Sequence, residues 1–306
     1  MSTVNKTFKF KAINSTFLSG GLKCGGTLYL PIGINNPAII IMAHGFAGTR
    51  DFRLDAFAER FVEAGVAAFF FDYRNFGDSE GEPRHWVDPK RHQEDYYEAL
   101  KHVKSLTEID ANRIILWGSS LSGGHVLTIA GKQPSIAAVI AQVPHVSGIP
   151  TMLAMKTSDL LKAVGAALRD ILSNTLFKSH YYSPVFGKPG EFAAMNSEGS
   201  WEGFKQLVPP GSRWENKVLA RVFLKIPMYS PSHSVHRILV PSLIIAGSKD
   251  TVTPAATTRR VATKIKEAEF HMLECTHFEP YTGDYFEKNI AIQIEFLKRH
   301  GFCPQM

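Results

Sequence analysis

Residues 116–125 read Leu116-Trp117-Gly118-Ser119-Ser120-Leu121-Ser122-Gly123-Gly124-His125. An apolar run, residues 114–117, leads into this stretch, and residues 121–131, which are small and apolar, follow it. The first run is typical of a buried strand and the second of a buried helix. Glycine and serine between them permit a sharp turn in which strand and helix approach closely. We therefore expect a strand, a tight turn and a helix, with Ser120 at the turn.

The sequence on both sides of this turn alternates between strand-like and helix-like segments. Strands are expected at 6–13, 22–30, 38–43, 66–71, 114–117, 137–143, 242–246 and 269–273, and helices at 51–63, 96–106, 121–131, 254–266 and 286–300. Strands that alternate with helices form parallel sheets with helices on both faces. The prediction is an α/β fold with a doubly wound, mostly parallel, eight-stranded sheet.

The alternation stops after Pro144 and resumes near residue 238. Between them lie an amphipathic helix, expected at 159–172, and a stretch rich in Pro, Gly, Ser and aromatic residues. We interpret 1–144 and 238–306 as the core and 145–237 as an inserted helical cap. Its aromatic side chains could line a substrate pocket, but we expect more than half to form the cap's own small core. They are Phe177, Tyr181, Tyr182, Phe186, Phe192, Trp201 and Phe204.

The turn at Ser120 resembles the nucleophile elbow, Gly-x-Ser-x-Gly, of the α/β-hydrolase family. Gly118 and Ser120 match the motif, whereas Ser122 stands where the family has its second glycine. The resemblance implies that Ser120 is the nucleophile. Three alternatives stay open at this stage: Ser122 as nucleophile, Ser119 as nucleophile, and a tight turn with no chemistry.

A serine nucleophile needs a base that titrates near neutral pH, which means histidine. In the family the chain order is serine, acid, histidine, each after a core strand. Asp250 follows the strand expected at 242–246, and His277 follows the one expected at 269–273. Asp250 could instead be a simple turn residue ahead of a helix, which we expect Thr253 to cap with Pro254 as the first helical residue. The resemblance implies that His277 is the general base and that Asp250 orients it.

The same resemblance implies two backbone donors for the oxyanion of the reaction. One is the N–H of Leu121, directly after the nucleophile. The other is the N–H of Phe46, in a His44-Gly45-Phe46 loop that is similar to the family's His-Gly-x motif. His44 would shape this loop, which could also be an ordinary strand-to-helix turn. Asp72 lies in a segment that resembles a supporting family motif, and we expect it to pair internally.

Composition limits the partners and the compartment. The net charge of +6 comes from scattered Lys and Arg residues among acids, so a nucleic-acid partner is not expected. No signal sequence and no apolar run long enough to span a membrane is present, and a cytoplasmic location is the expectation. Three widely spaced cysteines indicate neither disulfides nor a metal site. No metal or cofactor is expected, and homodimer formation stays open.

These features favour a serine hydrolase that cleaves a carboxylic ester or thioester of a small acyl substrate through an acyl-enzyme on Ser120. Within the family, the elbow and the segment 213–221 are similar to polyketide-releasing hydrolases and transferases of the dienelactone-hydrolase-like group. That similarity leaves acyl or polyketide transfer and peptide cleavage as alternatives. A further alternative is a binding protein without catalysis on the same fold.

Overall fold

The computed structural model describes residues 7–133, 135–149 and 157–304. Eight strands form one sheet in the order β1-β2-β4-β3-β5-β6-β9-β10. Their bounds are β1 Phe10–Ser19, β2 Leu22–Pro31, β3 Ile39–Ala43, β4 Ala67–Phe71, β5 Ile114–Ser119, β6 Ala138–Gln142, β9 Ser242–Gly247 and β10 Ala268–Leu273. In this order, the strands from β4 to β10 are parallel to their neighbours. Strand β2 is antiparallel to both of its neighbours, β1 and β4. The predicted eight-stranded, mostly parallel sheet is confirmed.

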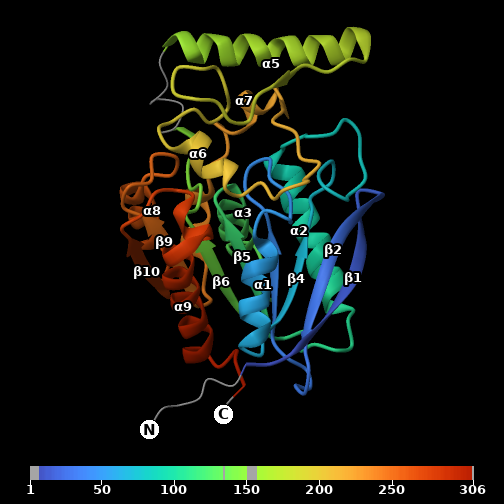
Figure 1. Cartoon of the computed structure of the whole chain (residues 1–306), viewed down its shortest axis with the longest axis vertical. Coiled ribbons are helices and arrows are strands. Elements are labelled where there is room, and N and C mark those ends of the chain that lie inside the picture. The colour runs from blue at the N-terminus through green and yellow to red at the C-terminus, as the bar shows by residue number, and fades with distance from the viewer. Residues whose placement is uncertain (1–6, 134, 150–156, 305–306) are drawn as a thin grey trace.

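Helices cover both faces of the sheet (Figure 1). The core helices are α1 Leu54–Glu63, α2 Pro89–Lys104, α3 Leu121–Ala130, α8 Ala255–Ala262 and α9 Gly283–Arg299. Helices α1 and α9 contact each other on one face, and α2 and α3 contact each other on the other. Strands β3, β4, β5 and β6 are buried along their whole length, as expected for apolar strands between two helical layers.

Because β3, β5, β9 and β10 are parallel, their carboxyl ends lie at one edge of the sheet. The chain between β6 and β9 leaves the sheet and lies over this edge, at the top of Figure 1. Its elements are α5 Thr157–Phe177, β7 Tyr182–Ser183, α6 Ser200–Lys205, β8 Val218–Leu219, α7 Val222–Lys225, η1 Pro231–His233 and η2 Val235–Arg237. The elements η1 and η2 are short 3₁₀ helices, and a third, η3 Glu279–Tyr281, lies between β10 and α9.

Several expected boundaries were wrong, including the start of α2, which was expected at 96 but lies at Pro89, and the end of α8, which was expected at 266 but lies at Ala262. The first strand was expected at 6–13, but β1 runs from Phe10 to Ser19, and residues up to 6 lie outside the described part. Its polar second half is a strand because it pairs residue for residue with β2, across a turn at Gly20 and Gly21. The cap helix was expected at 159–172, but α5 extends from Thr157 to Phe177.

Candidate active site

Ser120 lies between β5 and α3 in a backbone conformation that is costly for a residue with a side chain. Its φ is 56° and its ψ is −121°. Such a conformation costs about 1–3 kcal/mol and persists only where the surroundings impose it. Here the Ser120 N–H donates to the Gln142 carbonyl over 3.0 Å, and its own carbonyl accepts from the N–H of Gly124 at 3.2 Å and of His145 at 2.9 Å. These bonds fix the turn that presents the hydroxyl.

The residues around the turn must be small. A Cβ at Gly118 would lie 2.3 Å from the carbonyl oxygen of Ser122, which is backbone that cannot move aside. Ser122, at the second glycine position of the family motif, is fully buried. Its hydroxyl lies 2.8 Å from that of Tyr96 and accepts from that of Tyr73 at 3.2 Å. A serine is accommodated here because its hydroxyl has these partners.

The other serine of the turn also has partners away from the base. The Ser119 hydroxyl contacts that of Tyr281 at 2.5 Å and accepts from the Gln142 amide at 3.1 Å. Neither Ser119 nor Ser122 forms a hydrogen bond with His277 in the described structure. Of the three serines considered from sequence, the geometry therefore favours Ser120.

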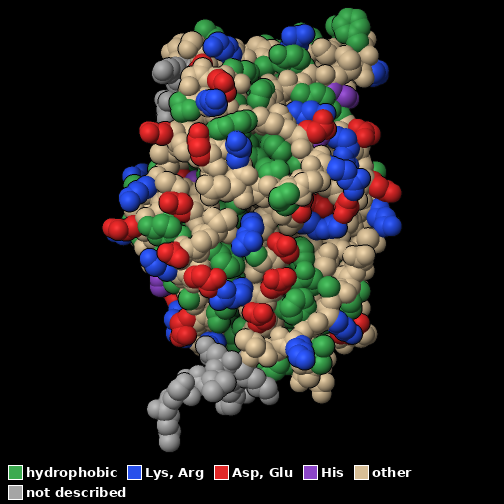
Figure 2. Space-filling model, viewed as in Figure 1, with side chains coloured by type: hydrophobic (Ala, Val, Ile, Leu, Met, Phe, Trp, Pro, Cys, Tyr) green, Lys and Arg blue, Asp and Glu red, His purple; other side chains and the backbone are tan. Residues whose placement is uncertain are grey.

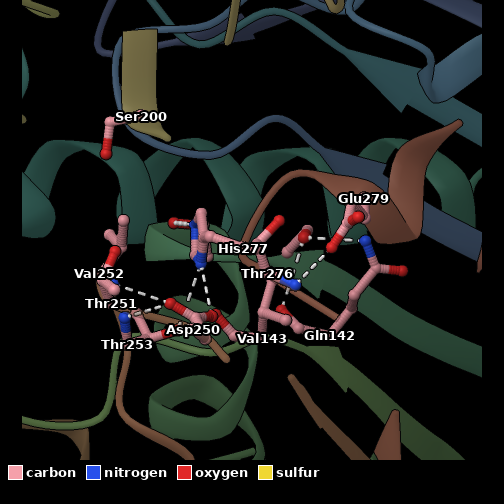
Figure 3. A network of polar contacts seen from close by, with 12 residues as sticks. Gln142, Val143, Ser200, Asp250, Thr251, Val252, Thr253, Thr276, His277 and Glu279 are labelled. Carbon is pink, nitrogen blue, oxygen red and sulfur yellow. Dashed lines mark hydrogen bonds and ion pairs between the residues drawn. The ribbon is translucent and has the colours of Figure 1, made fainter. Parts of the chain in front are cut away.

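The structure brings Ser120, His277 and Asp250 together at the carboxyl edge of the sheet. The Ser120 Oγ lies 3.0 Å from His277 Nε2, and His277 Nδ1 lies 2.7 Å from Asp250 Oδ2. All three residues are more than nine-tenths buried. Figure 3 shows the His277 ring over the Asp250 carboxylate, each on its own loop. The three side chains form one continuous line of hydrogen bonds.

Asp250 is held as an anion by its loop. Its Oδ1 accepts from the N–H of Val252 at 2.8 Å and of Thr253 at 2.7 Å, and its Oδ2 lies 2.8 Å from the Thr253 hydroxyl (Figure 3). Burial alone would raise the pKa of Asp250, but the His277 ring and the bonds from His277 and Thr253 hold it below its ordinary value. The carboxylate therefore stays ionised at neutral pH.

Thr253 was expected to cap the following helix, and that expectation was wrong. Helix α8 begins at Ala255, with Pro254 as its N-cap residue. The Thr253 hydroxyl instead reaches Asp250 and the Val143 carbonyl, which is 3.0 Å away. Sequence reasoning missed this positioning residue, although its place three residues after the acid was a usable signal.

The predicted oxyanion loop lies against Ser120. A Cβ at Gly45 would be 3.1 Å from that of Ser120, so the loop backbone passes directly beside it. Phe46 and Leu121 both line the same cavity as Ser120. Leu121 is the first residue of α3, where the N–H has no acceptor within the helix. Within the described residues, the Phe46 N–H also has no backbone acceptor. Both amides are thus free to bind an anionic oxygen.

His44 packs against the rings of Tyr73 and Phe76 beneath this loop. It is buried, and its Nδ1 lies 3.0 Å from the Gly45 carbonyl. Burial lowers the pKa of His44 to about 4, so the ring is neutral at pH 7. Asp72 pairs internally, as expected: it accepts from the Arg50 backbone N–H at 2.7 Å and from the Arg50 guanidinium at 3.2 Å.

Two cavities meet at Ser120 beneath the cap. The larger, of about 120 Å³, has an aliphatic wall that includes Leu160, Val222, Ile226 and Val252. The smaller, of about 40 Å³, has an aromatic wall made by the core and cap. The cap aromatics in it are Phe186 and Phe204, whose rings stack at a centroid distance of 3.5 Å. Phe177 is instead exposed, and Tyr181, Tyr182, Phe192 and Trp201 line neither cavity.

The segment 213–221 links the cap to the core. The Trp214 indole N–H donates to the Ala47 carbonyl in the oxyanion loop over 2.7 Å. The Asn216 side chain accepts from the N–H of Phe186 at 2.9 Å and donates to its carbonyl. The Arg221 guanidinium forms an ion pair with the buried Asp170 of α5. This segment therefore positions both the aromatic wall and the loop beside Ser120.

Metal binding finds no support in the described residues, where no group of three or more His, Cys, Asp or Glu side chains could hold an ion. Among the described helices, none is long and apolar enough to cross a bilayer.

Known proteins resemble this chain in sequence and in fold. Residues 35–201 match the family model described as serine aminopeptidase, S33. The quorum-quenching protein AidA of Acinetobacter baumannii is 41% identical over 283 residues, which is 92% of this chain and 93% of AidA. Thiohydrolase aneE of Aspergillus aculeatus is 29% identical over 292 residues, covering 91% of this chain and 90% of aneE.

A solved structure extends the comparison. The crystal structure of the α/β-hydrolase GrgF from Penicillium sp. sh18 matches with a TM-score of 0.81 and 25% identity, covering 95% of this chain and 99% of GrgF. A polyketide transferase named grgF, from a Penicillium species, is 26% identical over 285 residues, covering 92% of this chain and 93% of grgF. The chain belongs to the α/β-hydrolases of the serine aminopeptidase S33 family.

Proposed function

We propose that this chain is a serine hydrolase that cleaves a carboxylic ester or thioester through an acyl-enzyme on Ser120. The observation that carries the proposal is the unbroken line from the Ser120 hydroxyl through His277 to the ionised Asp250. Such a line converts a weakly nucleophilic hydroxyl into one that can attack a carbonyl carbon. The hydrolase and thiohydrolase relatives support the same class of reaction.

In the first half-reaction, His277 Nε2 removes the hydroxyl proton as the Ser120 oxygen bonds to the substrate carbonyl carbon. The carbonyl electron pair moves onto its oxygen, where the N–H groups of Phe46 and Leu121 would bind it. The intermediate then collapses and expels the alcohol or thiol, which takes the proton from His277. Asp250 stabilises the imidazolium and fixes Nδ1–H as the donor on its side of the ring.

In the second half-reaction, water replaces the departed group. It gives a proton to His277 and attacks the acyl carbon, and the Ser120 oxygen then leaves and takes that proton. The products are a free acid and the restored enzyme. We further propose that residues 145–237 act as the cap over a core of 1–144 and 238–306, and that the aliphatic cavity holds the acyl chain.

Replacing the nucleophile tests the proposal. Ser120→Ala should lower kcat for p-nitrophenyl butyrate by at least about a thousandfold, with residual activity from the remaining site. Ser122→Ala is the matched control, because its hydroxyl bonds to tyrosines instead of His277. Unchanged turnover in Ser120→Ala would remove this residue from the mechanism.

A second candidate is acyl or polyketide transfer, which the polyketide transferase relative favours. The same three side chains would serve, with an alcohol or amine attacking the acyl-enzyme in place of water. Mass spectrometry of the products with and without an added alcohol acceptor separates the two. An acceptor-bound product formed in preference to the free acid would make transfer the main reaction. Because AidA is named a quorum-quenching protein, small signalling esters also belong among the substrates to try.

A further inference from the structure

Helix α5 exposes large apolar side chains on the outside of the molecule. Leu161, Leu168, Leu172, Leu176 and Phe177 are all exposed, Phe177 by 75%. With Val164 and Ile171, also exposed, the four leucines recur at intervals of three and four residues and so lie along one side of the helix, whereas Phe177 is exposed because it ends the helix. A helix on a protein surface normally turns this side toward the core.

The side of α5 that faces the protein carries small residues instead. Ala163, Ala166, Ala167 and Asp170 are the buried positions. Figure 1 shows α5 as a bar across the top of the molecule, with the rest of the cap below it. In Figure 2 hydrophobic and basic side chains share this upper edge. The apolar stripe, defined as residues 161, 168, 171, 172 and 176, therefore faces away from the rest of the protein.

The charges beside the apolar stripe are positive. Lys162 and Arg169 are exposed on the helix, and Lys178 follows its last residue. Asp170 is buried in its ion pair with Arg221, and Asp159 and Lys162 lie 3.6 Å apart and offset each other, so the net positive charge on this side comes from Arg169 and Lys178. An anionic surface is thus complementary to this side of the helix.

A second copy of the chain fits the apolar stripe poorly. A helix of 21 residues is about 31 Å long. A stripe about 10 Å wide along it would bury roughly 600 Å² over both copies, well below the ~1,200 Å² of a stable interface. Antiparallel pairing would also bring the two Arg169 side chains together near the centre. Four charged residues within α5 exclude a membrane span, but they do not prevent the helix from lying flat on a bilayer.

We propose that α5 docks this protein on the surface of an anionic lipid bilayer. The apolar stripe would enter the boundary between headgroups and acyl chains, and Arg169 and Lys178 would contact lipid phosphates. Leu160, Ala163 and Val164 of the same helix line the aliphatic cavity at Ser120. An apolar ester in the bilayer would then lie close to Ser120. This consequence rests on the proposed function, but docking itself does not depend on it.

Flotation with vesicles tests the proposal. The full chain should float with phosphatidylglycerol–phosphatidylcholine vesicles and much less with phosphatidylcholine alone. The double variant Leu168→Glu/Leu172→Glu should lose at least tenfold in vesicle affinity. Ile32→Glu is the matched control, because Ile32 is exposed but follows β2, which ends at the edge of the sheet opposite the cap. This control should float like the parent protein.

Three results would overturn docking: no flotation of the parent protein, equal flotation of the double variant, or flotation indifferent to phosphatidylglycerol. Sedimentation equilibrium tests the other occupant, a second copy of the chain. If the parent protein is a dimer and Leu168→Glu/Leu172→Glu is a monomer, the apolar stripe is a dimer interface and docking is wrong. Circular dichroism establishes that each variant is folded. Ser120→Ala should float normally, so failure of the proposed chemistry and failure of docking are distinguishable.

Discussion

Asp250→Asn isolates the electrostatic part of the site. The asparagine oxygen can still accept the N–H groups of Val252 and Thr253, but its NH₂ group replaces the oxygen that faces His277. A donor at that place forces His277 Nδ1 to accept, so the proton moves to Nε2, which can no longer take the Ser120 proton. A wrong tautomer of this kind costs about 10⁴-fold in kcat, or about 5.5 kcal/mol in the activation free energy.

Hydrolysis of p-nitrophenyl butyrate measures this loss, and urea unfolding measures stability. The free energy of unfolding should change by only about 1–2 kcal/mol, because the Thr253 hydroxyl keeps the Val143 carbonyl as a partner. Asp88→Asn is the matched control: Asp88 is 7% exposed, as is Asp250, and likewise accepts two backbone N–H groups just ahead of a helix. A loss of less than tenfold in Asp250→Asn, or an equal loss in Asp88→Asn, would refute the assigned role.

Three further outcomes are expected. Gly118→Ala should abolish activity and lower the unfolding free energy by several kcal/mol in urea titration, because its Cβ would meet the Ser122 carbonyl at 2.3 Å; a folded, active variant would contradict the turn geometry. Burial lowers the pKa of His125 to about 3 and of His145 to about 4, so the unfolded chain gains protons first as the pH falls. Stability should therefore be full above about pH 6.5 and decline toward pH 4 by up to about 1.4 kcal/mol per pH unit for each ring. An unchanged urea midpoint between pH 7 and pH 5 would argue against neutral buried rings. Ala163→Phe should fill the aliphatic cavity and lower kcat/KM for p-nitrophenyl octanoate more than for the acetate, whereas equal effects would place the acyl chain elsewhere.

The core of the fold could be predicted because its signals are local. Each parallel strand is an apolar run, and burial between two helical layers requires such a run. The resemblance to the α/β-hydrolases predicted the order of Ser120, Asp250 and His277, and each of these residues follows a strand. Parallel strands then bring residues far apart in sequence to one edge, which is why positions 157 residues apart come within 3.0 Å.

The cap could not be predicted in the same detail, because its contacts are not local. Trp214 reaches the oxyanion loop 167 residues earlier in the chain, and no sequence period indicates that bond. The role of Thr253 was predicted wrongly for a related reason. A threonine before a proline favours a helix cap, but the Thr253 hydroxyl bonds to Asp250 and to the Val143 carbonyl instead. The apolar side of α5 is visible in the sequence, yet only the structure shows that it faces outward.

Covalent labelling with a fluorophosphonate tests the central claim most directly. The probe reacts with a serine only where a base activates the hydroxyl. Intact mass spectrometry should show one adduct per chain, and peptide mapping should place it on Ser120 and not on Ser119 or Ser122. Labelling should be lost in His277→Ala. An unlabelled protein that is folded, or an adduct on another residue, would contradict the account.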